Sequence, residues 1–151
     1  MLLESDLQAT GTQWELDLPD SLPELEVDRI QIRQVLLNLC ANAIDAMRHC
    51  SGEKRIRITA RISAADRLQL RIRDWGPGIP SEMHEVLFRP LGCLEPNGLA
   101  MGLAISRRII EAHAGSLQIM DGVRPGVELC CELPIGLPVC RCSQTVQVPS
   151  P

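Results

Sequence analysis

Hydrophobic and polar positions follow a helical period over the longest regular segment of the chain, residues 28–47. Apolar side chains recur there every three or four residues, as on one face of a helix, at Ile30, Val35, Leu36, Leu39, Cys40, Ala43, Ile44 and Met47. Asp28 can accept hydrogen bonds from the first free amides of such a helix. We therefore predict a long amphipathic helix, capped by Asp28, whose apolar face enters a core.

Shorter segments alternate with a period of two, which predicts strands with one polar face. In the first part of the chain these segments are Thr12–Leu18, Lys54–Ile62 and Leu68–Asp74. Two more strands are predicted at Ser116–Met120 and Val127–Leu133. Short turns separate the second strand from the third and the fourth from the fifth, so we expect two hairpins.

Two further helices complete the predicted elements: a short one at Ser81–Leu87, and one at Met101–Ala114 that Gly115 should end. Between them, residues 89–97 contain Pro and Gly without a period, which predicts a loop. Two hairpins with interspersed helices favour an α+β fold: a two-layer α/β sandwich with a mixed, mostly antiparallel sheet and helices on one face.

The domain organisation follows from the same pattern. Residues 12–135 are predicted to form one domain, which is a usual size for a single core. Residues 1–11 are predicted to be irregular or the remnant of an upstream helix, and residues 136–151, with three Pro and no pattern, a flexible tail.

Composition narrows the class of protein. With 45% hydrophobic residues, 23% charged residues and a net charge of −4, the chain is typical of a folded soluble protein. The mild acidity argues against general binding to nucleic acid or to an anionic membrane surface, so any polyanion must be held by a local site. The odd number of cysteines, seven, is typical of reduced thiols in the cytoplasm, where we place the chain.

Two carboxamides, Asn38 and Asn42, lie one helical turn apart on the long predicted helix. An uncharged carboxamide offers both an oxygen acceptor and an N–H donor, so such a pair can hold a hydrated hard cation together with a phosphate oxygen. Hydrogen bonding of two partly buried side chains to neighbouring loops explains the pair equally well, and on the helix alone both interpretations stay open.

Two glycine-containing segments add candidate chemistry. Asp74-Trp-Gly-Pro-Gly78 follows a predicted strand, where a carboxylate can accept a hydrogen bond from the exocyclic amine of adenine and glycines allow close approach to a planar ligand. Gly98-Leu-Ala-Met-Gly-Leu103 runs into a predicted helix, whose N-terminus suits phosphate. Taken singly, each segment is also explained as a simple turn or a helix-packing site.

Taken together and in this order, the segments resemble the catalytic ATP-binding domain of sensor histidine kinases, in the Bergerat-fold (GHKL) superfamily shared with Hsp90, type II topoisomerases and MutL. The asparagine-bearing helix resembles the N box, residues 73–80 the G1 box, Leu87-Phe-Arg-Pro90 the F box, and residues 98–116 the G2 box with its helix. The resemblance covers about residues 12–135 and is greatest to the nitrogen-regulation and oxygen-sensing type of kinase.

The resemblance implies roles for individual residues of this sequence. Asn42 would ligate Mg²⁺ on the ATP phosphates, and Asn38, the candidate catalytic residue, would contact phosphate or order the waters of the metal. Asp74 would bind the adenine amine. The base and phosphates would be bordered by Gly76, Gly78, Ile79, Gly98, Gly102 and Leu103.

The implied activity is phosphoryl transfer to a protein histidine, not ATP hydrolysis. The hydrolytic relatives have Glu at the position of Asn38, and Asn is not an effective general base. The implied partners are a separate dimerisation domain with the acceptor His, which this chain is expected to lack, and a response regulator. The isolated domain is expected to be a monomer without direct membrane contact.

Two positions depart from the family pattern. Glu95 stands where the family usually has Lys, and Ala100 replaces the middle glycine of the G2 box. Ala100 carries a conformational cost only if its φ is positive. These departures keep an alternative open: a degenerate module of the same fold that binds nucleotide weakly or not at all and docks a protein partner. Trp75, next to Asp74, is a natural fluorescence reporter for ATP.

Overall fold

The structure is a computed structural model that describes residues 8–88 and 98–136, with residues 98–100 described by their backbone alone. Its elements are β1 (Gln13–Asp17), α2 (Arg29–Met47), β2 (Arg55–Ile62), β3 (Arg67–Asp74), α3 (Ser81–Leu87), α4 (Gly98–Ala112), β4 (Ser116–Ile119) and β5 (Glu128–Pro134). The predicted loop at 89–97 and nearly all of the predicted tail at 136–151 lie outside the described residues.

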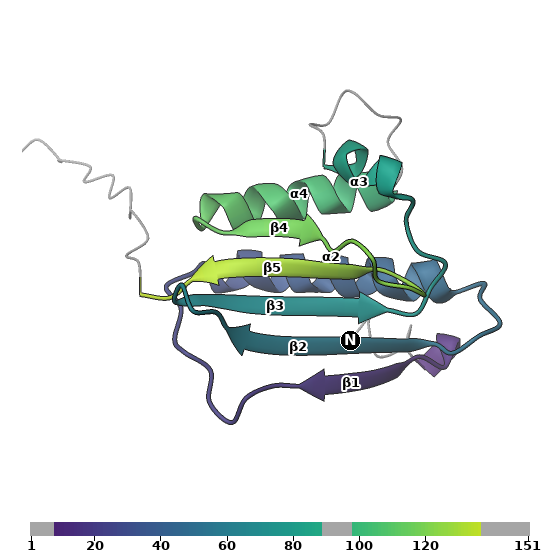
Figure 1. The fold of residues 1–151 in the computed structure, drawn as a ribbon, viewed down its shortest axis with the longest axis horizontal. Helices are drawn as coiled ribbons and strands as arrows, with labels where there is room; N and C mark the ends of the chain where they lie inside the picture. Colours follow the sequence, from purple (N-terminus) through teal and green to yellow (C-terminus); the bar gives the residue numbers. More distant parts are fainter. Residues whose placement is uncertain (1–7, 89–97, 137–151) are drawn as a thin grey trace, which may run out of the picture.

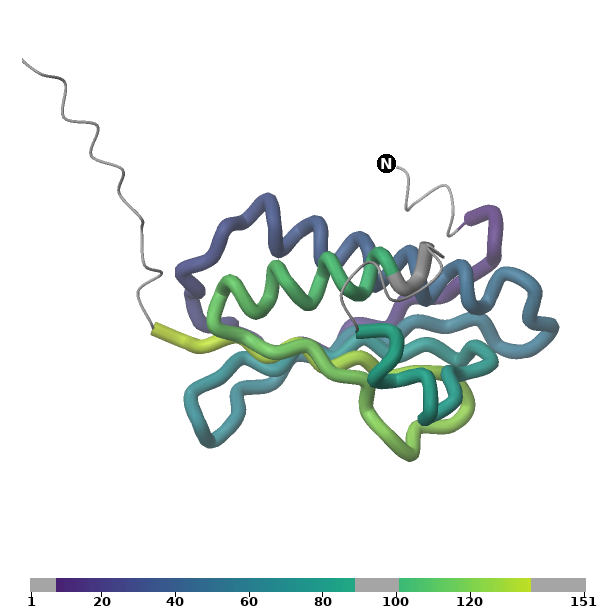
Figure 2. Tube along the Cα trace, turned by 90° about the horizontal axis from the view of Figure 1, so that it is seen from above, coloured from purple at the N-terminus to yellow at the C-terminus, as the bar shows by residue number. Residues whose placement is uncertain are grey.

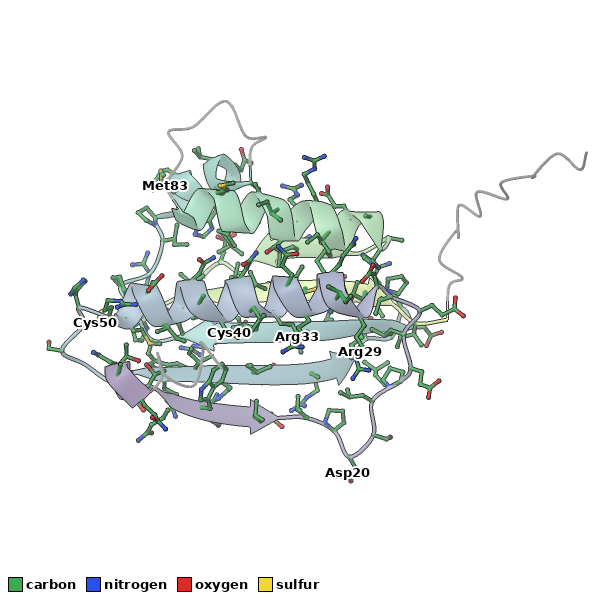
Figure 3. The ribbon with its side chains drawn as sticks, turned by 180° about the vertical axis from the view of Figure 1, so that it is seen from behind. Asp20, Arg29, Arg33, Cys40, Cys50 and Met83 are labelled. Carbon is green, nitrogen blue, oxygen red and sulfur yellow. The ribbon has the colours of Figure 1, made fainter. Side chains whose placement is uncertain are left out.

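The strands form one sheet in the order β1-β2-β3-β5-β4. β1 pairs with β2 in parallel, and the three other pairs are antiparallel. Both predicted hairpins, β2–β3 and β4–β5, are present. Helices α2 and α4 lie on one face of the sheet, and the described part of the chain places no helix on the other face (Figures 1 and 2). Figure 3 shows the molecule from the helix-covered side, with α2 in front of the strands. The predicted α+β fold, with a mixed sheet and helices on one face, is confirmed.

The core lies between the helices and the sheet. Helix α2 buries the predicted apolar stripe from Val35 to Met47, with Ile44 and Met47 almost fully inaccessible. Ile30, predicted on the same face, is 80% exposed in the first turn of the helix, so that part of the prediction is wrong. Leu103 and Ile110 of α4 and Ile56 of β2 join the same cluster. Fully burying an aliphatic side chain contributes about 1.5–3 kcal/mol, so this aliphatic cluster holds the two helices on the sheet.

The N-cap of α2 is the predicted residue, Asp28. Its Oδ1 accepts hydrogen bonds from the amides of Ile30 (2.9 Å) and Gln31 (3.1 Å). The amide of Asp28 itself donates to Nε2 of His113, at 3.0 Å, while Nδ1 of His113 lies 2.7 Å from the carbonyl oxygen of Ile109. His113 is thus neutral with its proton on Nδ1, and it joins the end of α4 to the start of α2.

Replacing His113 with alanine should lower the free energy of unfolding by about 2–4 kcal/mol, because it removes a buried side chain and leaves the amide of Asp28 without its acceptor. Urea denaturation followed by circular dichroism measures the change. His49 is exposed and makes no hydrogen bond among the described residues, so His49→Ala is the matched control and should change stability by less than about 0.5 kcal/mol. Equal effects of the two substitutions would contradict this role of His113.

Helix α4 differs from the prediction at both ends. It begins at Gly98 instead of Met101, because the intervening Leu, Ala and Met are strong helix formers. Ala100 therefore lies inside a helix, where φ is negative and alanine carries no conformational penalty. The helix ends at Ala112, and the left-handed residue that follows is Ala114, with φ of 57°, not Gly115. Gly115 serves packing instead, since a Cβ there would lie 2.2 Å from the carbonyl oxygen of Glu132.

Candidate functional site: a cavity between α2, the end of β3 and α4

Asp74 is the last residue of β3, and its side chain is buried on the helix-covered side of the sheet. Its Oδ1 accepts hydrogen bonds from the amides of Gly76 (2.8 Å) and Val127 (3.3 Å). Among the described residues nothing donates to Oδ2. Burial raises the pKa of the Asp74 carboxyl, against the opposing effects of the two amides and the charge of Arg73. The carboxylate is therefore fixed in orientation, with one oxygen left to accept from a ligand.

Glycines allow the backbone to close around Asp74. Gly126, two residues before β5, has φ of +88°, and a Cβ there would lie 1.9 Å from the backbone oxygen of Asp74. Gly78 has φ of +84° and passes close to the carbonyl oxygen of Gly126. Positive φ is a conformation that glycine adopts without steric cost. The segment from Asp74 to Gly78 is thus held against β5 by contacts that only glycine permits.

Asn42 lies on α2 opposite Gly102 of α4. The carboxamide nitrogen of Asn42 is buried and has no hydrogen-bond partner in the described part of the chain. A Cβ added at Gly102 would lie 3.7 Å from this nitrogen, so α4 passes close to the carboxamide with no side chain between them. A buried polar group without a partner is costly and requires an explanation, and a ligand that accepts its hydrogen bond is one.

Asp74 and Asn42 share one cavity of about 550 Å³. Its walls come from α2, β3, the turn after β3, α4 and β5, and consist of Leu39, Asn42, Ala43, Asp45, Ala46, Ile72, Asp74, Pro77, Gly78, Ile79, Leu103, Val127 and Leu129. A mostly apolar cavity with a few polar groups is the usual form of a small-ligand site. This lining suits an apolar planar group beside Asp74 and a polar group beside Asn42.

Five of the predicted site residues line this cavity: Asn42, Asp74, Gly78, Ile79 and Leu103. Gly76 does not line the cavity, but its amide donates a hydrogen bond to the Asp74 carboxylate. Gly102 lies next to the side chain of Asn42. Asn38 is half-buried on α2, one turn before Asn42, and is not part of the cavity wall. Gly98 begins α4 and so belongs to the helix and not to a loop preceding it, which corrects that part of the sequence interpretation, while Gly102 lies in the helix as predicted.

Sequence reasoning missed the apolar wall. Leu39 lies three residues before Asn42 and Ala46 four residues after it, Ala43 follows Leu39 by four, and Ile72 is two residues from Asp74 on the same strand face. These positions could be predicted from the helical and strand periodicity. Val127 and Leu129 were not, because only the pairing of β3 with β5 brings them to the site.

A second carboxylate, that of Asp45, lies at the rim of the cavity. It is largely exposed and pairs with Arg48 at 2.8 Å, which partly offsets its charge. A further hollow of about 650 Å³ lies on the other side of the turn at residues 77–80, against the β4–β5 connection. Neither Asp74 nor Asn42 lines it, so the cavity that holds these two residues is the candidate site.

Trp75 does not line the cavity. Its ring stacks against the guanidinium groups of Arg55 and Arg73, with ring-centre distances of 4.1 and 4.5 Å. These arginines belong to the face of the sheet opposite Asp74, because successive side chains of a strand alternate. Trp75 is therefore a poor direct reporter of the cavity, contrary to the sequence interpretation.

Comparison with known protein families matches residues 27–137 to the family described as "Histidine kinase-, DNA gyrase B-, and HSP90-like ATPase". The match covers well over half of the chain, which belongs to this family. Its ligand class is therefore that of an ATP-binding domain.

Similar proteins include the C4-dicarboxylate transport sensor protein DctB of Rhizobium meliloti (strain 1021), 34% identical over 122 residues, which are 81% of this chain and 19% of that protein. The sensory histidine kinase/phosphatase NtrB of Klebsiella oxytoca is 38% identical over 113 residues, 68% of this chain and 31% of that protein. The chain thus spans less than a third of the length of these two relatives.

Among solved structures, the catalytic domain of the histidine kinase ThkA in a nucleotide-free form superimposes with a TM-score of 0.73 at 30% identity, covering 88% of this chain and 86% of that one. The fold is therefore that of a histidine kinase catalytic domain. No helix in the described ranges is long and apolar enough to cross a membrane.

Proposed function

We propose that this chain is the ATP- and Mg²⁺-binding catalytic domain of a two-component sensor kinase, which presents the γ-phosphate to a histidine on a separate dimerisation domain. The observation that carries the proposal is the convergence of the Asp74 carboxylate and the unpartnered Asn42 carboxamide on one cavity. Asp74 would accept a hydrogen bond from the exocyclic amine of adenine, while Gly78 and Ile79 lie along the base.

The residues present fit a hydrated Mg²⁺ with phosphate. Asn42 offers an uncharged oxygen to the cation or a donor to a phosphate oxygen, and Gly102 places no side chain between the carboxamide and α4. When bound, Mg²⁺ would neutralise charge on the phosphates. Leu103 closes the cavity on the α4 side.

Asn38 supports transfer to a protein over hydrolysis of ATP. It lies one turn from Asn42 and carries a carboxamide, which does not take a proton from water near neutral pH. Catalysis would then rest on positioning and electrostatics. The acceptor histidine and a response regulator would come from other domains or chains, and we place the domain in the cytoplasm as a monomer.

A degenerate, partner-docking module of the same fold is the second candidate. Asp45 at the cavity rim supports it, and Glu95, outside the described residues, is a second acidic residue close in sequence to the G2 segment. A carboxylate beside a triphosphate would oppose binding, by about 1 kcal/mol for each pair of charges at 4 Å in bulk water and more in a less polar environment.

Calorimetric titration distinguishes the two candidates. ATP should bind with an affinity that rises on adding Mg²⁺, and Asn42→Ala should remove this Mg²⁺ dependence while leaving the affinity for adenosine within about two-fold. Asp74→Asn should weaken the binding of both ATP and adenosine. Absence of binding at millimolar ATP would favour the docking module. An Mg²⁺ dependence that survives in Asn42→Ala would remove Asn42 from the metal site.

Gly102→Ala should separate stability from function. Alanine in a helix interior is about 0.5–1 kcal/mol more favourable than glycine, and the new methyl meets nothing closer than 3.7 Å. We therefore expect a higher free energy of unfolding but weaker binding of ATP·Mg²⁺, because the methyl covers Asn42. Thermal denaturation and calorimetry measure the two quantities, and unchanged ATP affinity would contradict the placement of phosphate beside Gly102.

A further inference from the structure

The face of the sheet that no described helix covers carries a striped charge pattern. Six arginines project from the two central strands, β2 and β3: Arg55, Arg57, Arg61, Arg67, Arg71 and Arg73. Acidic side chains border them on both sides, from β1 (Glu15 and Asp17) and from β5 (Glu128 and Glu132). Figure 1 shows this face toward the viewer, with α2 and α4 behind the strands.

Most of these arginines have a carboxylate partner. Arg71 pairs with Glu128 and Arg67 with Glu132, each at 3.6 Å, and Arg61 pairs with Asp17. The arginines of β2 and β3 and the carboxylates of β1 and β5 therefore largely neutralise each other over most of this face.

The arginines around Trp75 are the exception to this neutralisation. Arg57 and Arg73 lie directly opposite each other on β2 and β3, an unfavourable arrangement for like charges, and both stack on the Trp75 ring, at 5.4 and 4.5 Å. The ion pair of Arg57 with Glu15, at 3.0 Å, uses the same carboxylate oxygen as that of Arg55, at 3.3 Å. Arg73 has no carboxylate within ion-pair distance in the described part of the chain.

Donors also outnumber acceptors in this cluster. The buried Nε atoms of Arg57 and Arg73 have no hydrogen-bond partner among the described residues. The Nε of Arg55 lies 3.4 Å from a carboxylate oxygen of Glu53, so Glu15 and Glu53 are the two carboxylates that face these three arginines. Stacking on an aromatic ring holds a guanidinium while leaving its N–H edge free to bind a carboxylate in bidentate fashion. The cluster is thus an ordered set of cations that lacks one anion.

We propose that Arg57, Arg73 and Trp75 form a docking site for a protein segment that contributes carboxylate side chains. Neither cavity described above includes these three residues, so the surface suits a protein better than a small molecule. Tryptophan and arginine are also the residues most enriched at the energetic centres of protein interfaces. The flanking acidic stripes would repel the continuous phosphate backbone of a nucleic acid, whereas a partner with carboxylates confined to its centre complements the pattern.

The site lies directly behind the candidate nucleotide cavity. Arg73 and Trp75 flank Asp74 in the sequence, and the side chain of Asp74 enters the cavity on the other face of the sheet. The docking proposal does not depend on nucleotide binding, because its contacts are confined to the open face.

Trp75 makes the test direct. Trp14 is the other tryptophan of the chain, so Trp14→Phe leaves Trp75 as the sole emitter. In this background we would titrate a ten-residue peptide of alternating glutamate and serine, the matched glutamine–serine peptide, and sodium phosphate, all at constant ionic strength. We expect a saturable fluorescence change with the glutamate peptide alone, and at least five-fold weaker binding after Arg73→Gln.

Arg61→Gln is the matched control, since Arg61 lies on the same face but is paired with Asp17 away from Trp75; its affinity should stay within two-fold. Calorimetry of the unsubstituted chain with the same peptides covers the case in which Trp14→Phe does not fold. Equal responses to both peptides, equal losses in the two arginine variants, or no saturable response would overturn the proposal. If phosphate saturated the site with the same affinity as the glutamate peptide, the site would bind simple anions and the proposed protein docking would be wrong.

Discussion

Asp74→Asn is expected to weaken ATP binding by roughly 10- to 100-fold, because a hydrogen bond to a charged group contributes about 1.5–3 kcal/mol. The amides of Gly76 and Val127 both point at Oδ1, so they would hold the asparagine with its oxygen toward them and its NH₂ group toward the cavity. The adenine amine would then meet a donor instead of an acceptor. Calorimetric titration of both proteins with ATP measures the loss.

The same substitution should not lower stability. Because burial raises the pKa of Asp74, the folded state holds the proton more tightly than the unfolded state. The contribution of Asp74 to the free energy of unfolding therefore falls as pH rises from below the ordinary aspartate value, about 3.9, through the raised folded pKa. Asparagine does not ionise, so Asp74→Asn does not lose stability in this way. The difference in free energy of unfolding between Asp74→Asn and the unsubstituted chain should therefore increase in favour of the variant over that pH range and then level off.

Asp45→Asn is the matched control for charge, since Asp45 lines the same cavity at its rim. Its removal should leave ATP affinity unchanged or raise it by reducing repulsion with the phosphates. If Asp45→Asn lost as much affinity as Asp74→Asn, general electrostatics would explain the result and the specific contact with adenine would not.

Gly126→Ala should give the largest loss of stability, about 3–5 kcal/mol. Its φ of +88° is costly for any residue with a side chain, and its Cβ would overlap the backbone oxygen of Asp74 at 1.9 Å. Backbone strain of this kind costs about 1–3 kcal/mol, and forced repacking a similar amount. Urea denaturation measures the change, and nucleotide binding should fall with it because the end of β3 must move.

Gly122→Ala separates strain from overlap. Gly122 lies in the same β4–β5 connection with φ of +76°, but nothing lies within 4 Å of its added Cβ. Its cost should stay near 1–2 kcal/mol, the conformational part alone. A loss in Gly126→Ala no larger than that in Gly122→Ala would mean that the contact between β5 and Asp74 is not as tight as described.

Local pattern was sufficient to predict the elements and their class of fold. The cap at Asp28 and the apolar stripe of α2 from Val35 to Met47 follow from spacing and side-chain chemistry, and the structure confirms both, whereas Ile30 of the predicted stripe is exposed. The convergence of Asn42 and Asp74 could be expected only through the family resemblance, because nothing in the local sequence brings α2 to the end of β3.

What the sequence could not predict depends on pairing across the sheet. The amide of Val127 reaches Asp74, and Leu129 reaches the cavity, only because β5 pairs with β3. The position of Trp75 also depends on the sheet: strand alternation puts Arg73 on the face opposite Asp74, and Trp75 stacks on it there. The start of α4 at Gly98 differs from the predicted start at Met101 for another reason. Glycine at position 98 suggests a loop, but the residues that follow it favour a helix.

The most direct test of the account is the choice between ATP and inosine triphosphate, which differ chiefly in having an amine or a carbonyl oxygen at position 6 of the base. If Asp74 recognises the amine, the unsubstituted chain should bind ATP at least ten-fold more tightly in calorimetric competition. Asp74→Asn should lose or reverse this preference, because its NH₂ group can donate to the carbonyl. Equal affinities for the two nucleotides in the unsubstituted chain would contradict the account.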